Sequence, residues 1–175
     1  MKNKATVLCI LGLFVTAACF VAGCGRDEST TFATPGGTVK VTAKQSGREG
    51  VVTVETKEGA ATIKTGPQAI TEAELGAPVY PGAQVVSSGQ FGQTKDAGSG
   101  VASTFLMSTN DSFDKVSAFY KTNLKDVQQS MDQTAGDQKI AMFMTGKKGN
   151  MRNVQIIAKT SGGPTNIQIT KIVEK

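Results

Sequence analysis

The sequence predicts an α+β fold, in which a β-rich antiparallel sheet carries one packed amphipathic helix and follows a small β-meander. Three observations support this prediction. Apolar and polar residues alternate with a period of two over much of the chain, as they do in half-buried strands. A single segment near residue 115 instead spaces its apolar residues three and four apart, which is typical of a helix. Glycine-containing turns separate the alternating segments, so consecutive strands can pair as antiparallel neighbours.

The predicted meander occupies residues 38–66. Valine, alanine and isoleucine alternate there with threonine and lysine in three short segments, and glycine-containing turns join them. The three segments are residues 38–44, 51–57 and 61–65. Gly66 and Pro67 end the block and mark the predicted boundary with the next unit.

The predicted α+β domain occupies residues 67–175. Thr71 is placed to cap one helical turn, and a connector rich in proline and glycine follows at residues 76–83. Asn110 or Asp111 is expected to cap the helix, which ends near Leu124. The expected strands are residues 84–91, 100–108, 127–132, 139–145, 151–159 and 166–173.

The predicted helix has one apolar stripe. Its residues lie three or four positions apart and are Phe113, Val116, Phe119, Tyr120 and Leu124. We therefore expect this stripe to pack on one face of the sheet. The segment Val-Tyr-Pro-Gly-Ala at residues 79–83, combined with Phe119-Tyr120, resembles a group of uncharacterised bacterial envelope proteins. This resemblance covers residues 75–175 and implies no activity.

The N-terminus predicts export. A short positive segment, residues 1–4, is followed by an uncharged, largely apolar stretch of residues 5–22. The stretch ends in Val21-Ala22-Gly23-Cys24, which resembles the lipobox of bacterial lipoproteins. That resemblance implies a signal peptide at residues 1–23, cleavage between Gly23 and Cys24, and a diacylglycerol and an acyl chain such as palmitate on Cys24. The alternative is an uncleaved N-terminal membrane helix.

Residues 24–37 are predicted to form the lipid anchor and a flexible tether, because they are polar and end in Pro35-Gly36-Gly37. The expected location is therefore extracytoplasmic and membrane-anchored. In Gram-negative members of the lipoprotein family, aspartate after the lipidated cysteine favours the inner membrane. Gly25 stands there in this chain, which favours the outer membrane facing the periplasm.

Composition argues against most catalytic chemistry. The chain contains no histidine, and its three cysteines are Cys9 and Cys19 in the signal and Cys24 at the anchor. Histidine-based nucleophile activation, histidine metal sites and proton shuttles near pH 7 are therefore excluded. We expect no catalytic residue, no metal site and no cofactor. The net charge of +5 is only weak evidence for an anionic partner.

One motif favours an enzyme. Ser112-x-x-Lys115 at a helix start resembles the nucleophile motif of penicillin-binding proteins and serine β-lactamases, and Ser108-Thr-Asn110 and Lys64-Thr-Gly66 resemble the other two signatures. The order of the motifs is reversed and the chain is too short for that fold. Ser112 is better interpreted as a residue of the first helical turn.

Two further groups of side chains suggest ligands. Met142 and Met144 share one strand face, and Met131 and Met151 are nearby in the chain. Thioethers suit Cu(I), but an apolar core or groove is the favoured interpretation.

A basic turn contains Lys147, Lys148 and Arg152. These residues either contact lipid phosphate or an anionic polymer, or they form a solvated hairpin tip. Nucleic acid is not expected, because no aromatic residues interleave with the basic ones.

These patterns predict a lipid-anchored, non-catalytic cell-envelope module. It binds an envelope protein or an apolar ligand, or it supports envelope assembly. A structural alternative is an oligomerising protein whose meander adds strands to a neighbouring chain through an open sheet edge. A Ser-Lys hydrolase based on Ser112 and Lys115 is the remaining alternative.

Overall fold

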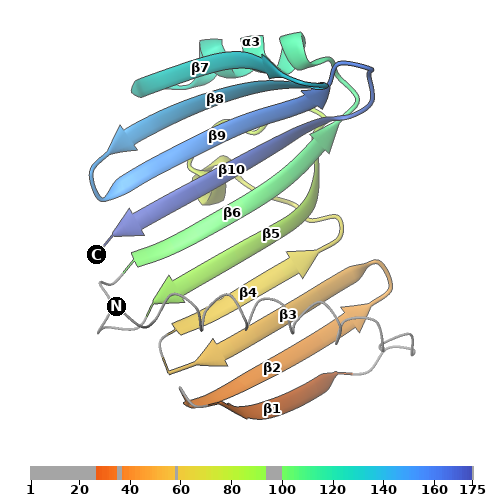
Figure 1. Cartoon of the computed structure of the whole chain (residues 1–175), viewed down its shortest axis with the longest axis vertical. Helices are drawn as coiled ribbons and strands as arrows, with labels where there is room; N and C mark the ends of the chain where they lie inside the picture. The colour runs from red at the N-terminus through yellow and green to blue at the C-terminus, as the bar shows by residue number, and fades with distance from the viewer. Residues whose placement is uncertain (1–26, 35–36, 58, 94–99, 175) are drawn as a thin grey trace.

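The computed structural model describes residues 27–34, 37–57, 59–93 and 100–174 (Figure 1). The predicted signal peptide, the cleavage site between Gly23 and Cys24 and the predicted lipidation of Cys24 lie outside the described residues. Within the described ranges, no helix has the length and apolar character needed to cross a membrane.

A single antiparallel sheet of ten strands makes up most of the molecule. The strands are β1 (Glu28–Thr34), β2 (Gly37–Ser46), β3 (Glu49–Thr56), β4 (Gly59–Thr65), β5 (Gln84–Gln93), β6 (Gly100–Thr109), β7 (Val127–Ala135), β8 (Gln138–Lys147), β9 (Asn150–Lys159) and β10 (Thr165–Glu174). Their order across the sheet is β1-β2-β3-β4-β5-β6-β10-β9-β8-β7. Neighbours in the sheet are neighbours in the chain except at one place, where β6 pairs with β10.

The predicted α+β class is wrong, because the molecule is mostly β. The described residues contain only two short helices, α2 (Glu72–Leu75) and α3 (Phe113–Asn123). The period-two pattern correctly located the strands, but it does not reveal that β4 pairs with β5, from Gly59–Gln93 to Thr65–Ser87. That pairing joins the predicted meander and the predicted domain in one continuous sheet (Figure 1).

Residues that the sequence assigns to a flexible tether form the first strand. β1 pairs with β2 from Glu28–Ala43 to Thr34–Gly37. The Thr34 hydroxyl donates a hydrogen bond to the Gly37 carbonyl at 2.7 Å, and Gly37 has a φ of 126°, which favours glycine at this hairpin. The segment is polar but rich in threonine, a residue that fits strands well, so its polarity hid its strand character.

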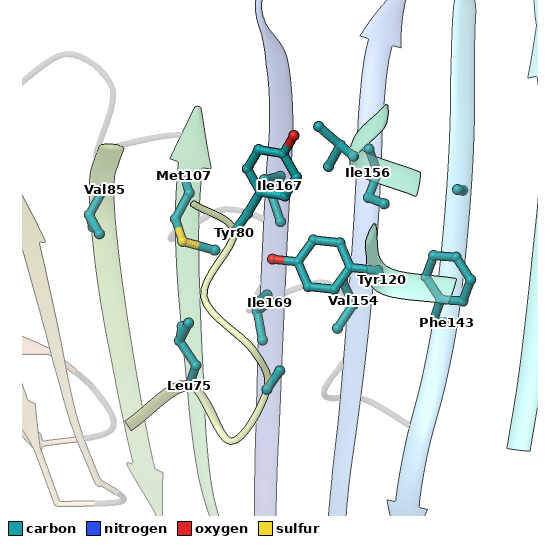
Figure 2. Packing of buried hydrophobic residues seen from close by; sticks show 13 residues of the cluster. Leu75, Tyr80, Val85, Met107, Tyr120, Phe143, Val154, Ile156, Ile167 and Ile169 are labelled. Carbon is teal, nitrogen blue, oxygen red and sulfur yellow. The ribbon is translucent and has the colours of Figure 1, made fainter. Parts of the chain in front are cut away.

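The core lies between one face of the sheet and a layer formed by α3 and the connector around α2 (Figure 2). Its largest buried side chains are Leu75, Met107, Val116, Tyr120, Phe143, Val154, Ile156, Ile167 and Ile169. They come from this layer and from β6, β8, β9 and β10. No described residue of β1 to β4 is buried. The sheet therefore has a core under only part of its area.

Local signals set the two helices. Thr71 and Glu74 form a reciprocal capping box at α2, as the position of Thr71 predicts. The cap of α3 is Ser112, whose hydroxyl accepts the Lys115 N–H at 3.4 Å, so the predicted caps Asn110 and Asp111 are wrong. Asp111 immediately precedes the cap, and its carboxylate accepts hydrogen bonds from the side chains of Tyr80 and Lys115.

Candidate functional site

One face of the sheet is not covered by any described segment, and we call it the open face. Strand alternation identifies it, because side chains point to opposite faces in turn. In β8, for example, Phe143 is buried under the helical layer, so Met142 and Met144 point to the open face. The same alternation, followed through the printed register, assigns each strand's residues to the open or the covered face.

An apolar band crosses the open face. Seven neighbouring strands each contribute one apolar residue to a single row of cross-strand partners. In order across the sheet, these residues are Val41, Val54, Ala61, Phe91, Ala102, Ile172 and Met151. Strands lie about 4.8 Å apart, so the band is roughly 30 Å long. A second row adds Ala43, Val52 and Ile63 beside it on β2 to β4.

Most exposed apolar side chains belong to this face. Among the described residues, nine large apolar side chains are exposed, and seven of them lie on the open face. The seven are Phe32, Val52, Ile63, Phe91, Met131, Met151 and Ile172. Single exposed apolar residues are ordinary, but their concentration on one continuous face marks an interaction surface.

The open face carries almost no charge. The charged residues that alternate onto it are Glu28, Lys159 and Glu174, each of which is the first or last residue of its strand. The polar residues nearer the centre are neutral: the hydroxyls of Thr104 and Thr170 lie 3.3 Å apart. An apolar partner could therefore dock on this face without removing a charge from water.

Polar groups gather on the covered face around Asp111. The Tyr80 hydroxyl donates to Asp111 Oδ2 at 2.7 Å, and Lys115 Nζ donates to Oδ1 at 2.9 Å. The Thr165 hydroxyl donates to the Asp111 carbonyl at 2.7 Å. This cluster links the connector, the start of α3 and the start of β10. Its place at the junction of three elements indicates a structural role.

Both titratable partners in this cluster have shifted pKa values. The hydrogen bond from Tyr80, together with the one from Lys115, lowers the pKa of the Asp111 carboxyl. Burial, helped by the Asp111 carboxylate, raises the pKa of Tyr80 to about 12. Burial also raises the pKa of Tyr120, whose hydroxyl lies within the core without a hydrogen bond of normal geometry. Tyr80 therefore acts as a hydrogen-bond donor to a carboxylate rather than as a proton source.

The residues of the hydrolase alternative are not brought together. Lys115 directs its ammonium to Asp111 and offers Ser112 only its main-chain N–H. Ser108 alternates onto the open face of β6, whereas Lys64 alternates onto the other face of β4. The Lys115 ammonium is therefore paired with a carboxylate instead of acting on the Ser112 hydroxyl, as activation of a serine would require.

The basic turn is divided between two environments. Lys147 pairs in register with Asn150 beside the turn that contains Lys148, while Arg152 pairs with Thr145 on the covered face. Arg152 lies against Gly76, where an added β-carbon would overlap its Nε. It lines a cleft of about 370 Å³ together with Glu72, Lys125 and Asp126, so acidic and basic residues are mixed there. Contact of the three basic residues with an anionic surface stays a prediction.

The four methionines of the suggested Cu(I) group lie on the open face. Met131 on β7 pairs in register with Met142 on β8, and Met144 and Met151 share that face. These four side chains belong to the uncovered apolar face and not to the core, and a groove at them stays a prediction. Within the described part of the chain, no group of three or more histidine, cysteine, aspartate or glutamate residues could hold a metal ion.

Sequence reasoning missed the open face, although a signal for it was present. Residues 140–144, Ile-Ala-Met-Phe-Met, are apolar without interruption, as in strands whose two faces both contact apolar surroundings. The helix accounts for one of those faces and leaves the other without a partner. Comparison of the chain with protein-family models, with curated proteins and with solved structures gives no match.

Proposed function

We propose that this protein is a lipid-anchored, non-catalytic module of the cell envelope that binds an apolar surface through its open face. The observation that carries the proposal is the placement of seven of the nine exposed large apolar side chains on one uncovered face. A continuous apolar patch of this extent is unusual on a protein that works alone, because it exposes apolar area to water.

The anchor in this proposal is Cys24. Four residue steps separate Cys24 from Glu28, the first residue of β1. An extended chain covers at most about 3.6 Å per residue, so lipid on Cys24 would hold this edge of the sheet within about 14 Å of the anchoring residue. Two or more acyl chains make such an anchor stable, whereas one is marginal. Outer-membrane location facing the periplasm follows from Gly25 if the source is Gram-negative.

The non-catalytic part of the proposal has two supports. The chain contains no histidine, and the lysine of the Ser112–Lys115 motif is paired with Asp111. The Tyr80–Asp111–Lys115 cluster joins structural elements, and its shifts move Tyr80 and Asp111 away from the pKa range suited to proton transfer at neutral pH.

The anchor is tested by the mass of the mature N-terminal peptide and by membrane fractionation of the wild type and Cys24→Ala. We expect the wild-type peptide to begin at Cys24 with diacylglycerol and acyl mass. Cys24→Ala should lose that mass and leave the membrane fraction. An unmodified peptide that begins at Met1 would contradict the anchor and favour the membrane-helix alternative.

The binding face is tested by a photo-crosslinking phenylalanine analogue placed at Phe91 in intact cells. Gln90 is the matched control, because it is exposed on the same strand and points to the other face. Crosslinked products should form from position 91 and be absent or much weaker from position 90. Equal yields from the two positions, or none from either, would refute binding at the open face.

Strand addition at β1 is a second candidate, and the sequence of that edge strand favours it. Among the described strands, β1 pairs only with β2, and its sequence Glu-Ser-Thr-Thr-Phe-Ala-Thr contains neither proline nor lysine to block pairing. Hydrogen exchange distinguishes this mode from docking on the open face. Strand addition would protect the outward amides of β1, whereas docking on the face would leave them to exchange rapidly.

A further inference from the structure

We propose that the occupant of the open face is the open face of a second copy of this chain, so that two sheets pack against each other. The inference rests on the proposed function and names the partner for the same surface. Three features of the molecule support it: the first four strands lack a core, the open face is large, and that face carries almost no charge.

The first four strands have an apolar face but no core. Val41, Val54 and Ile63 point to one face, whereas the other face carries threonine, lysine and glutamate residues together with Val51 and Ala60. No described residue of these strands is buried, so neither face forms a packed core with the described residues. An apolar sheet face gains stability when it packs against another element. These four strands therefore offer an apolar face to a surface from outside the described residues.

The area of the open face is close to that of a stable dimer interface. Apolar residues occur on this face from Phe32 on β1 to Met131 on β7, which are the two outer strands. With neighbouring strands about 4.8 Å apart and two to three rows of residues along each strand, the face measures roughly 40 by 17 Å, or about 700 Å². This area includes neutral polar residues such as Thr104, Thr170 and Gln168 beside the apolar ones. A stable protein interface buries about 800 Å² on each partner.

Charge and shape favour a second sheet over a small ligand. The three charged residues of the face lie at strand ends, so face-to-face packing of two positively charged chains would bury no charge at its centre. Small ligands occupy concave sites that enclose most of their surface. The cleft beside Arg152 lies on the covered face, and the open face is a broad sheet surface. Two such surfaces can pack about 10 Å apart, as in β-sandwiches.

The test uses the full chain, expressed in cells as two differently tagged copies. The photo-crosslinking residue is placed at Phe91 or Ile63 on the open face, and at Gln90 or Thr62 as controls on the same strands but the other face. We expect the open-face positions to give a product with twice the chain mass that carries both tags. The control positions should give little of it.

A pair of charge substitutions on adjacent residues of β3 sharpens the test. Val54→Asp places a carboxylate in the apolar band, whereas Thr53→Asp places it on the other face. We expect Val54→Asp to reduce the doubly tagged product at least about tenfold, because burial of an unpaired carboxylate in the interface is strongly unfavourable. Thr53→Asp should leave the yield within about twofold of the wild type. Thermal unfolding of both variants checks that the C-terminal core remains folded.

The outcomes separate this inference from the proposed function. A product specific to Phe91 and Ile63 whose mass corresponds to a lipid or to a different protein would overturn the second copy and leave the proposed function standing. The absence of any product specific to the open face would overturn both. A doubly tagged product that forms equally well with Val54→Asp would overturn face-to-face packing, because that carboxylate would lie within the interface.

Discussion

The two ends of the sheet share the same alternation and differ in the face to which their apolar residues point. In β9, Val154 and Ile156 point to the covered face and are fully buried beneath the helical layer. In β3, Val52 points to the open face and is 39% exposed, because no described element lies over that face. The same period-two pattern therefore produces a core where the apolar residues face the helical layer and an apolar surface where they face away from it.

This comparison shows that burial in a sheet depends on the covering layer as much as on the strand. α3 and the connector are short, and they cover only β5, β6, β10, β9 and β8. The remaining strands are held by backbone pairing to their neighbours and by small cross-strand contacts, such as the Thr53 and Thr62 hydroxyls 3.4 Å apart. The N-terminal strands should therefore be the less stable end of an isolated chain.

The largest expected difference between the two ends comes from matched isoleucine substitutions. Ile167→Ala removes a fully buried side chain and should lower the free energy of unfolding by about 2–5 kcal/mol. Ile63→Ala removes a side chain that is 42% exposed and should cost about 1 kcal/mol or less in dilute protein. Urea unfolding measures both. Equal losses in the free energy of unfolding would contradict the difference between the two ends. A loss at Ile63 that grows with protein concentration would support packing against a second copy.

The Tyr80–Asp111 hydrogen bond should fix the covering layer at the well-packed end. Tyr80→Phe removes a 2.7 Å hydrogen bond to a carboxylate, and bonds to charged groups contribute about 1.5–3 kcal/mol. The matched control is Lys115→Ala, which removes the other partner of the same carboxylate. The Lys115 side chain is 67% exposed, so we expect this control to cost less than about 1 kcal/mol. Denaturant unfolding compares them, and a larger loss in the lysine variant would contradict the assignment.

The smallest expected effect is a pH dependence confined to the well-packed end. The pKa of folded Asp111 lies below its ordinary value of 3.8, so the unfolded chain binds more protons in this range. Its stabilising contribution should be complete above about pH 5 and should disappear as the pH falls through the folded pKa. Asp111→Asn removes this contribution.

Thermal unfolding between about pH 2.5 and 6 measures the Asp111 effect. The difference in melting temperature between wild type and Asp111→Asn should be constant above about pH 5 and shrink below about pH 4. Asp114→Asn controls for the loss of one carboxylate, because that side chain is 80% exposed on the same helical turn. A difference that persists unchanged at the lowest pH would show that the substitution acts through packing rather than through charge.

Local patterns predicted the elements, and long-range pairing was beyond them. Alternation located the nine strands from β2 to β10, and the spacing of Val116 and Tyr120 located α3. The pairing of β4 with β5 across the connector left no local mark, so the fold class was wrong. β1 was missed because its threonines were interpreted as a polar tether.

The candidate site was harder to predict than the fold. Alternation divides each strand into two faces but does not say which face a helix will cover. Met142 and Met144 were correctly placed on one strand face, which the register identifies as the open face. Extension of that face across β6 to the first strands depends on the register, which sequence periodicity alone does not fix.

The pairing of β6 with β10 has a consequence for how the molecule forms. Thr109 pairs with Thr165 and Gly100 pairs with Glu174, so this ladder closes only when the last strand is available. A chain that emerges from its N-terminus delivers the apolar strands β2 to β4 first and the strand that completes the core last. Non-local pairing of this kind is slow to form, and exposed apolar strands are prone to aggregate before it is complete. The nascent chain should therefore depend on a holding chaperone until β10, Thr165–Glu174, is released.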